Sequence, residues 1–208
     1  DHTWRTGHLK NRSRNALEKL CRSLSGRVAF QRFTFPQGQK KHLLFNIGNR
    51  QGESGSVNDA YIVYNQDGTV EGWVITEPEY VKKYQPGAVV PLYFSAVLDK
   101  KPLNYGAYNG NVQQQGARES KGVGAGMYFS FASENQEIVT AKIGLSYTSV
   151  ENARINLQQE ASDLDFDHVK ERAQAIWEDY LGRIRVETEC REDKVKFYTG
   201  LYLSLIHI

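Results

Sequence analysis

The sequence predicts a mainly β protein, in which an antiparallel β-sandwich is followed by two or three α-helices. Between about residues 26 and 148, short strand-like runs alternate with turns rich in Gly and Pro, a texture typical of sandwiches and barrels. No helical pattern of about ten residues fits between these runs, which argues against the crossover connections of a parallel sheet. After residue 148 the apolar period changes from that of strands to that of helices.

The clearest local signal in the β region is a hairpin. Residues 60–64 form an apolar and aromatic strand, Asn65–Gly68 is a turn sequence, and residues 69–76 form the returning strand. The longest run, residues 138–147, alternates strictly and is expected to bury one face. That face carries Val139, Ala141, Ile143, Leu145 and Tyr147. Other predicted strands are residues 27–35, 42–47, 92–98 and 127–131.

Three helices are predicted after the β region. The first covers residues 151–160, with Thr148 and Ser149 as N-cap candidates. The second begins after Asp165 and keeps an apolar stripe as far as Leu181. The third begins near residue 192 and has no stop signal before the end of the sequence. Its apolar side chains need a protein surface to cover them, so we expect the sequence to be a truncated piece of a longer protein.

Residues 1–25 differ from the rest of the sequence in composition and in hydrophobic pattern. They are polar and basic, and only residues 15–20 have the composition of a helical turn. We leave this segment unassigned, and a non-native or out-of-frame end is one interpretation of it.

The overall composition excludes several classes of partner and site. Lys and Arg number 26 against 24 Asp and Glu, so the net charge of +2 provides no general attraction to nucleic acid or to an anionic membrane. No run of about 18 apolar residues is present, so no membrane span is predicted. The two cysteines, Cys21 and Cys190, are too few and too distant to indicate a disulfide framework or a zinc site.

Motifs that superficially suggest chemistry have simpler explanations. Alternating acids at residues 163–167 resemble a calcium loop, but His168 and Gln174 stand where an EF-hand needs Gly and Glu, so helix capping explains these acids better. The Gly-rich residues 122–126 precede a strand rather than a helix, which disfavours a phosphate-binding loop. Spacing pairs none of the candidate acids Glu71, Glu77, Glu79 and Glu119 for glycoside hydrolysis. We therefore assign no catalytic and no metal-binding residue.

Three aromatic residues are weak candidates for binding substrate. Trp73, Tyr105 and Tyr108 could line a sugar groove, and residues 105–110 have the composition of a loop at the edge of such a groove. Ordinary packing at the ends of strands is the alternative explanation for these side chains.

Several segments resemble glycoside hydrolase family 92. Residues 142–157 are similar to the passage from strand to helix at the end of that family's N-terminal domain, and residues 30–36 resemble an earlier stretch of the same domain. Residues 165–167, Trp177 and residues 181–184 continue the motif, and residues 197–202 resemble the start of the catalytic domain. The resemblance spans about residues 26–205. The family's Gly-rich segment near its N-terminus is not found here, and residues 203–208 depart from the family pattern.

The resemblance implies a fold, an activity and a location. Family members join a supersandwich-like N-terminal domain to an (α/α)6 barrel, and they are calcium-dependent, inverting exo-α-mannosidases. Their catalytic carboxylates and calcium ligands lie in the barrel, which this sequence does not reach. The implied partners are a mannose-containing glycan and the protein's own C-terminal barrel. Bacterial members are usually exported to the periplasm, the cell surface or the medium.

These observations together predict four segments. Residues 1–25 are unassigned, residues 26–148 form the sandwich, residues 149–188 form a helical linker, and residues 189–208 begin a truncated catalytic domain. At the passage from strand to helix, Glu151, Asn152 and Arg154 are predicted to hold the domain interface rather than to catalyse.

The leading functional hypothesis is a non-catalytic, inactive N-terminal portion of an α-mannosidase. A free-standing carbohydrate-binding module and a sandwich that only scaffolds are the alternatives.

Overall fold

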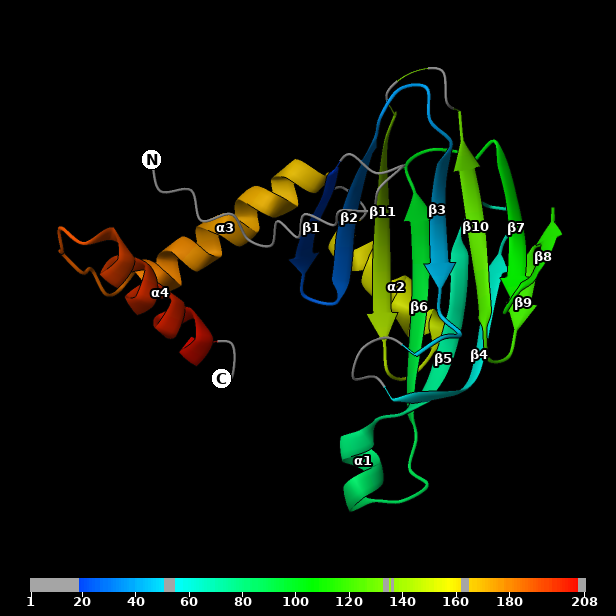
Figure 1. The fold of residues 1–208 in the computed structure, drawn as a ribbon, viewed down its shortest axis with the longest axis horizontal. Coiled ribbons are helices and arrows are strands. Elements are labelled where there is room, and N and C mark those ends of the chain that lie inside the picture. The colour runs from blue at the N-terminus through cyan, green and yellow to red at the C-terminus, as the bar shows by residue number, and fades with distance from the viewer. Residues whose placement is uncertain (1–18, 51–54, 133–134, 136, 162–164, 206–208) are drawn as a thin grey trace.

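The structure, a computed structural model, describes residues 19–50, 55–132, 135, 137–161 and 165–205. Within these residues two antiparallel sheets face each other, one helix lies against the outside of the larger sheet, a short helix lies at one end of the sheet, and the last helices extend away from it (Figure 1). The predicted fold class, an antiparallel sandwich followed by helices, is therefore confirmed.

The larger sheet has seven strands among the described residues. Their spatial order is β1 (Lys19–Ser25), β2 (Val28–Phe35), β11 (Glu137–Ser146), β6 (Val90–Leu98), β5 (Val70–Glu77), β4 (Ser56–Tyr64) and β9 (Glu119–Lys121). The smaller sheet has four, in the order β3 (Lys41–Asn46), β10 (Ala125–Phe131), β7 (Asn104–Asn109) and β8 (Val112–Gln115). The helices are α1 (Glu79–Tyr84), α2 (Val150–Ala161), α3 (Phe166–Gly182) and α4 (Arg191–Leu205).

The hairpin of β4 and β5 forms where the sequence predicts it, because the turn is fixed locally. The side chain of Asp67 accepts hydrogen bonds from the backbone N–H and the hydroxyl of Thr69, at 2.9 and 2.7 Å. Gly68 has a φ of 88°, a conformation that glycine adopts without strain. These contacts set the register that pairs Tyr64 with Val70.

Two predictions about local structure are wrong. Residues 19 and 20 belong to strand β1 rather than to a helical turn, while residues 15–18 lie outside the described residues. Strand β1 pairs with β2 along its whole length, and this pairing outweighs a weak local preference for helix. Residues 105–109 form strand β7 rather than a loop, paired with β10 on one side and β8 on the other. The short elements α1, β8 and β9 were not predicted.

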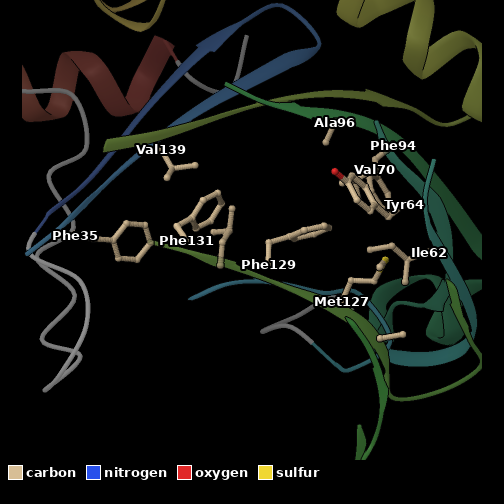
Figure 2. Close-up of a cluster of buried hydrophobic side chains, with 12 residues drawn as sticks. Phe35, Ile62, Tyr64, Val70, Phe94, Ala96, Met127, Phe129, Phe131 and Val139 are labelled. Atoms are coloured by element: carbon tan, nitrogen blue, oxygen red, sulfur yellow. The ribbon is translucent and has the colours of Figure 1, made fainter. Parts of the chain in front are cut away.

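The main core fills the space between the two sheets. Figure 2 shows its buried phenylalanines, Phe35, Phe94, Phe129 and Phe131, lying among aliphatic side chains from both layers. From the alternating face of β11, Val139 and Ala141 are buried and contribute to this side of the larger sheet. Tyr147 lies beyond the end of that strand and is mostly exposed.

A second core lies on the opposite face of the larger sheet, under α2 and the first turns of α3. It consists of Val28, Phe30, Leu157, Ala161, Phe166 and Val169. Asp165 caps α3, as predicted, by accepting a hydrogen bond from the N–H of His168 at 2.8 Å. Farther along, α3 leaves the sheet and meets α4, where the rings of Trp177 and Tyr202 lie 4.7 Å apart. Within the described part of the chain, no helix has the length and apolar character needed to cross a membrane.

Candidate functional site

An apolar groove of about 530 Å³ lies between β3 and the inner face of the larger sheet. Its walls come from strands that are distant in sequence: Phe33, Leu43, Phe45, Val74, Leu92, Ile143 and Leu145. The polar side chains in the lining are neutral, and they include Gln31, Asn46 and Asn49. Among the residues that the structure describes, the only ionisable groups lining this groove are the phenols of Tyr80 and Tyr147. The described lining therefore suits apolar groups, and none of its residues is a carboxylate of the kind that glycoside hydrolysis needs.

The second feature is an ion pair at the junction of the larger sheet with α2. Both oxygens of the Glu71 carboxylate accept hydrogen bonds from Arg154, from Nε and Nη2, each at 2.9 Å. The same carboxylate accepts from the hydroxyl of Ser95 at 2.9 Å and from the amide of Asn65 at 3.1 Å. The Glu71 side chain is only 7% exposed, and that of Arg154 is 41% exposed. A bidentate pair of this geometry fixes α2 to β5 in one orientation.

The electrostatics of Glu71 indicate a structural carboxylate. Burial pushes the pKa of Glu71 upward, but the hydrogen bonds from Arg154, Ser95 and Asn65 and the charge of Arg154 outweigh burial and hold it below its ordinary value. The partnership with Glu71 raises the pKa of Arg154 in turn. A general acid for glycoside hydrolysis needs a raised pKa. Glu71 is instead a stable anion at neutral pH.

The residues predicted to hold the interface all lie at this junction. Glu151 pairs with Arg154 from the first turn of α2. Asn152 donates from its backbone N–H to the Ser149 hydroxyl at 3.0 Å, and from its side chain to the Thr148 hydroxyl at 2.6 Å. These contacts cap α2, and a hydrogen bond of 2.9 Å between the hydroxyls of Thr148 and Ser146 ties the cap to the end of β11.

Gly144 allows α2 to lie directly on β11. A Cβ at this position would come within 2.3 Å of the carbonyl oxygen of Ala153 and within 2.9 Å of Cβ of Leu157. We expect Gly144→Ala to destabilise the protein by roughly 1–3 kcal/mol, because the helix must move outward. Urea unfolding measures this loss. Gly200→Ala, in α4 with nothing near its Cβ, is the matched control and should not destabilise. Equal stability of the two variants would contradict this close contact.

The structure does not bring the three candidate aromatic residues together. Trp73 lies on β5, where its ring is 6.3 Å from that of its cross-strand neighbour Tyr61. Tyr105 packs against the main core, with its ring 4.9 Å from that of Tyr64. The Tyr108 hydroxyl donates to the carbonyl oxygen of Phe45 at 3.3 Å, and burial raises the pKa of this hydroxyl. None of the three candidates lines the groove.

Sequence comparison decides the family. The model of the glycosyl hydrolase family 92 N-terminal domain matches residues 22–146, from within β1 to the end of β11. This chain belongs to glycosyl hydrolase family 92. The model of the family 92 catalytic domain matches residues 152–208, which begin in the first turn of α2. The boundary between the two matches therefore falls at the junction that Arg154 and Glu71 hold together. No curated protein matches the chain.

Solved structures of family 92 enzymes share the fold. An α-mannosidase from Bacteroides thetaiotaomicron, solved with mannoimidazole, is 22% identical with a TM-score of 0.75, over 88% of this chain and 24% of its own. An inverting mannosidase from the same organism is 22% identical with a TM-score of 0.70, and the match covers 86% of this chain and 23% of that enzyme. The family 92 glycosyl hydrolase ccman5 is 25% identical with a TM-score of 0.70, over 88% and 24%. The chain thus spans about a quarter of the length of these enzymes.

The calcium ion implied by family 92 does not fit the residues described here. No group of three or more His, Cys, Asp or Glu side chains within them is arranged to hold a metal ion. The acids near α3 have other partners: Asp165 caps the helix, and Asp167 accepts from Arg32 at 2.9 Å. Asp163 lies outside the described residues.

Proposed function

We propose that this chain is the non-catalytic N-terminal portion of an exo-acting, inverting α-mannosidase that acts on mannose-containing glycans. The observation that carries the proposal is the order of the two family matches, with the N-terminal domain first and the catalytic domain beginning in α2. The activity itself is drawn from the relatives, which are described as α-mannosidases and as an inverting mannosidase.

Within this proposal the sandwich positions the catalytic domain. The contacts of Arg154, Glu151 and Asn152 fix the direction in which α2 leaves the larger sheet. The second core then holds the first turns of α3, so the polypeptide enters the next domain from a defined place. We divide the chain into a sandwich at 26–148, a linker at 149–188 and the start of the catalytic domain at 189–208, although the catalytic-domain match already includes the linker.

Calcium and the catalytic carboxylates belong, in this proposal, to the remainder of the enzyme. The described residues that line the groove include no carboxylate, and Glu71 is held as an anion by Arg154. Inversion requires an acid and a base that flank the scissile bond with a water between them, and the described residues provide no such pair at the groove.

The test compares the 208-residue polypeptide with the full-length product of its gene, using an α-linked mannobiose as substrate. We expect the full-length enzyme to release mannose first as the β-anomer, followed by proton NMR, because inversion reverses the configuration. Chelation of calcium should abolish this activity and added calcium should restore it. The 208-residue polypeptide should release no mannose with or without calcium. Hydrolysis by that polypeptide, or none by the full-length enzyme, would refute the proposal.

A free-standing carbohydrate-binding module is the second candidate, and Trp73 favours it. This side chain is partly exposed on the larger sheet, beside Tyr61, and aromatic rings at such positions can stack on sugars. Calorimetric titration of the 208-residue polypeptide with the same mannobiose distinguishes the two candidates. Saturable binding without hydrolysis, lost in Trp73→Ala, would favour the module.

A further inference from the structure

The two sheets of the sandwich are unequal, and among the described residues the edge strand β3 of the smaller sheet has no strand on its outer side. Among the described residues, seven strands of the larger sheet face four of the smaller one. Strand β3 is the edge of the smaller sheet and pairs only with β10 within that part of the chain. In Figure 1, no strand of the smaller sheet lies beyond β3 on the side of β11 and β2.

The groove lies along this open edge. Leu44 and Phe45 of β3 form one wall, and Phe33 of β2, Leu92 of β6 and Ile143 of β11 lie on the larger sheet. These residues of the larger sheet are only partly buried, although their strand neighbours Val139 and Phe94 are buried in the main core. The larger sheet therefore carries apolar surface of the kind that a sandwich normally covers with a second layer.

We infer that the groove receives an extended polypeptide strand that pairs with the free edge of β3. A strand adjacent to β3 would lie about 4.8 Å from it and place every second side chain toward the larger sheet, about 10 Å away. An apolar residue at every second position would fill the groove, while the backbone would pair with the peptide groups of β3. Strand β3 has six residues, so the incoming strand would place about three side chains in the groove.

The same geometry selects the source of this strand. A second copy of the chain pairing through its own β3 would have only Leu44 free to enter the groove, because Leu43 and Phe45 already pack in its own core. A small apolar ligand would leave the row of β3 peptide groups without a partner. The solved relatives are about four times as long as this chain, so the strand comes from the part of the same family 92 polypeptide that lies outside these 208 residues. To that extent the inference rests on the proposed function.

A synthetic strand tests the inference on the 208-residue polypeptide. The probe is a fluorescein-labelled peptide of about eight residues with alternating Val and Thr between terminal lysines. The matched control peptide has the same composition, with its valines and threonines in separate blocks. We expect saturable binding of the alternating peptide, with hydrogen exchange of residues 41–46 slowed at least about tenfold at saturation. The block peptide should bind at least about tenfold more weakly, since it cannot present one apolar face.

Two surface variants locate the binding site. Leu44 lines the groove and is 60% exposed, so Leu44→Glu should fold normally and weaken binding of the alternating peptide about tenfold or more. Leu103, which is 70% exposed and does not line the groove, gives the control variant Leu103→Glu, which should bind as the unaltered protein does.

Three outcomes would overturn the inference. One is the absence of saturable binding. Another is equal binding of the two peptides, which would indicate only nonspecific adsorption to an apolar surface. The third is a concentration-dependent dimer that protects residues 41–46 without peptide, which would assign the edge to a second copy. None of these readouts involves hydrolysis of a mannoside, so failure here and failure of the proposed function can be distinguished.

Discussion

The Phe129→Ala variant is expected to lose about 3–5 kcal/mol of unfolding free energy. Phe129 is fully buried on β10, and its ring meets those of Phe45 at 5.6 Å and Tyr64 at 5.1 Å, both edge to face. Removal of the ring opens a cavity between the two sheets, among the core side chains that Figure 2 shows around Phe129, and the backbones of the sheets would have to move to close it. Because small domains are stable by only about 5–15 kcal/mol, this single change is expected to leave the sandwich close to unfolding.

Urea unfolding followed by tryptophan fluorescence measures this loss. Phe129→Leu keeps most of the buried volume and is expected to cost only about 1–1.5 kcal/mol. Leu103→Ala, at an exposed position, should change stability by less than about 0.5 kcal/mol. A loss under about 1 kcal/mol for Phe129→Ala would mean that the two sheets do not enclose this ring.

Elements whose signals are local could be predicted from the sequence. The turn at Asn65–Gly68 fixes the β4–β5 hairpin through contacts within a few residues, and Asp165 caps α3 in the same local way. Strand β1 could not be predicted, because its partner strand β2 decides its conformation. Strand β8 also gave no signal, since all four of its residues are exposed and no apolar alternation marks it.

The functional features depended on contacts that no sequence spacing shows. The groove combines Phe33, Leu92 and Ile143, which come from three strands far apart in the chain. Arg154 was expected at the interface, but its partner Glu71 lies 83 residues earlier in the sequence. A signal for Glu71 did exist: this acid stands inside a mostly apolar strand, between Val70 and the apolar run 73–75, and an acid at a covered position needs a cation.

The aromatic candidates failed to converge for a simple chemical reason. Tyrosine and tryptophan suit both a half-buried strand and a sugar-binding surface, so composition cannot separate the two uses. Tyr105 packs against the main core, and the hydroxyl of Tyr108 donates a hydrogen bond to the carbonyl oxygen of Phe45. The side chain of Trp73 remains partly exposed.

The Arg154→Ala variant is expected to lose about 2–3 kcal/mol of unfolding free energy at pH 7. A fully buried ion pair typically costs about 3–5 kcal/mol when one partner is removed, and the partial exposure of Arg154 reduces the value here. The loss arises because Glu71 keeps its charge but loses its partner in a buried position. Arg183→Ala removes an equally short pair with Asp179 in which both side chains are exposed, and it should cost less than about 0.5 kcal/mol.

In the full-length enzyme we expect the Arg154→Ala change to affect the melting temperature more strongly than the turnover number. Lost turnover at an unchanged melting temperature would refute a structural role.

The pH dependence of the unfolding free energy distinguishes the effect of the Glu71 charge from a simple loss of packing in the Arg154→Ala variant. In the unaltered protein the pKa of Glu71 is below its ordinary value of 4.5, so its contribution to stability is complete above about pH 4.5 and declines as the pH falls through the lower folded-state value. Without Arg154, burial is opposed only by the hydrogen bonds from Ser95 and Asn65, so the folded-state pKa of Glu71 rises and protonation relieves the destabilisation as the pH falls. The stability difference between the unaltered protein and Arg154→Ala should therefore be largest at pH 7 and shrink toward pH 4. The difference for Arg183→Ala should stay small throughout. A constant difference for Arg154→Ala between pH 7 and pH 4 would show that Arg154 stabilises α2 by contact alone, and not by compensating a buried carboxylate.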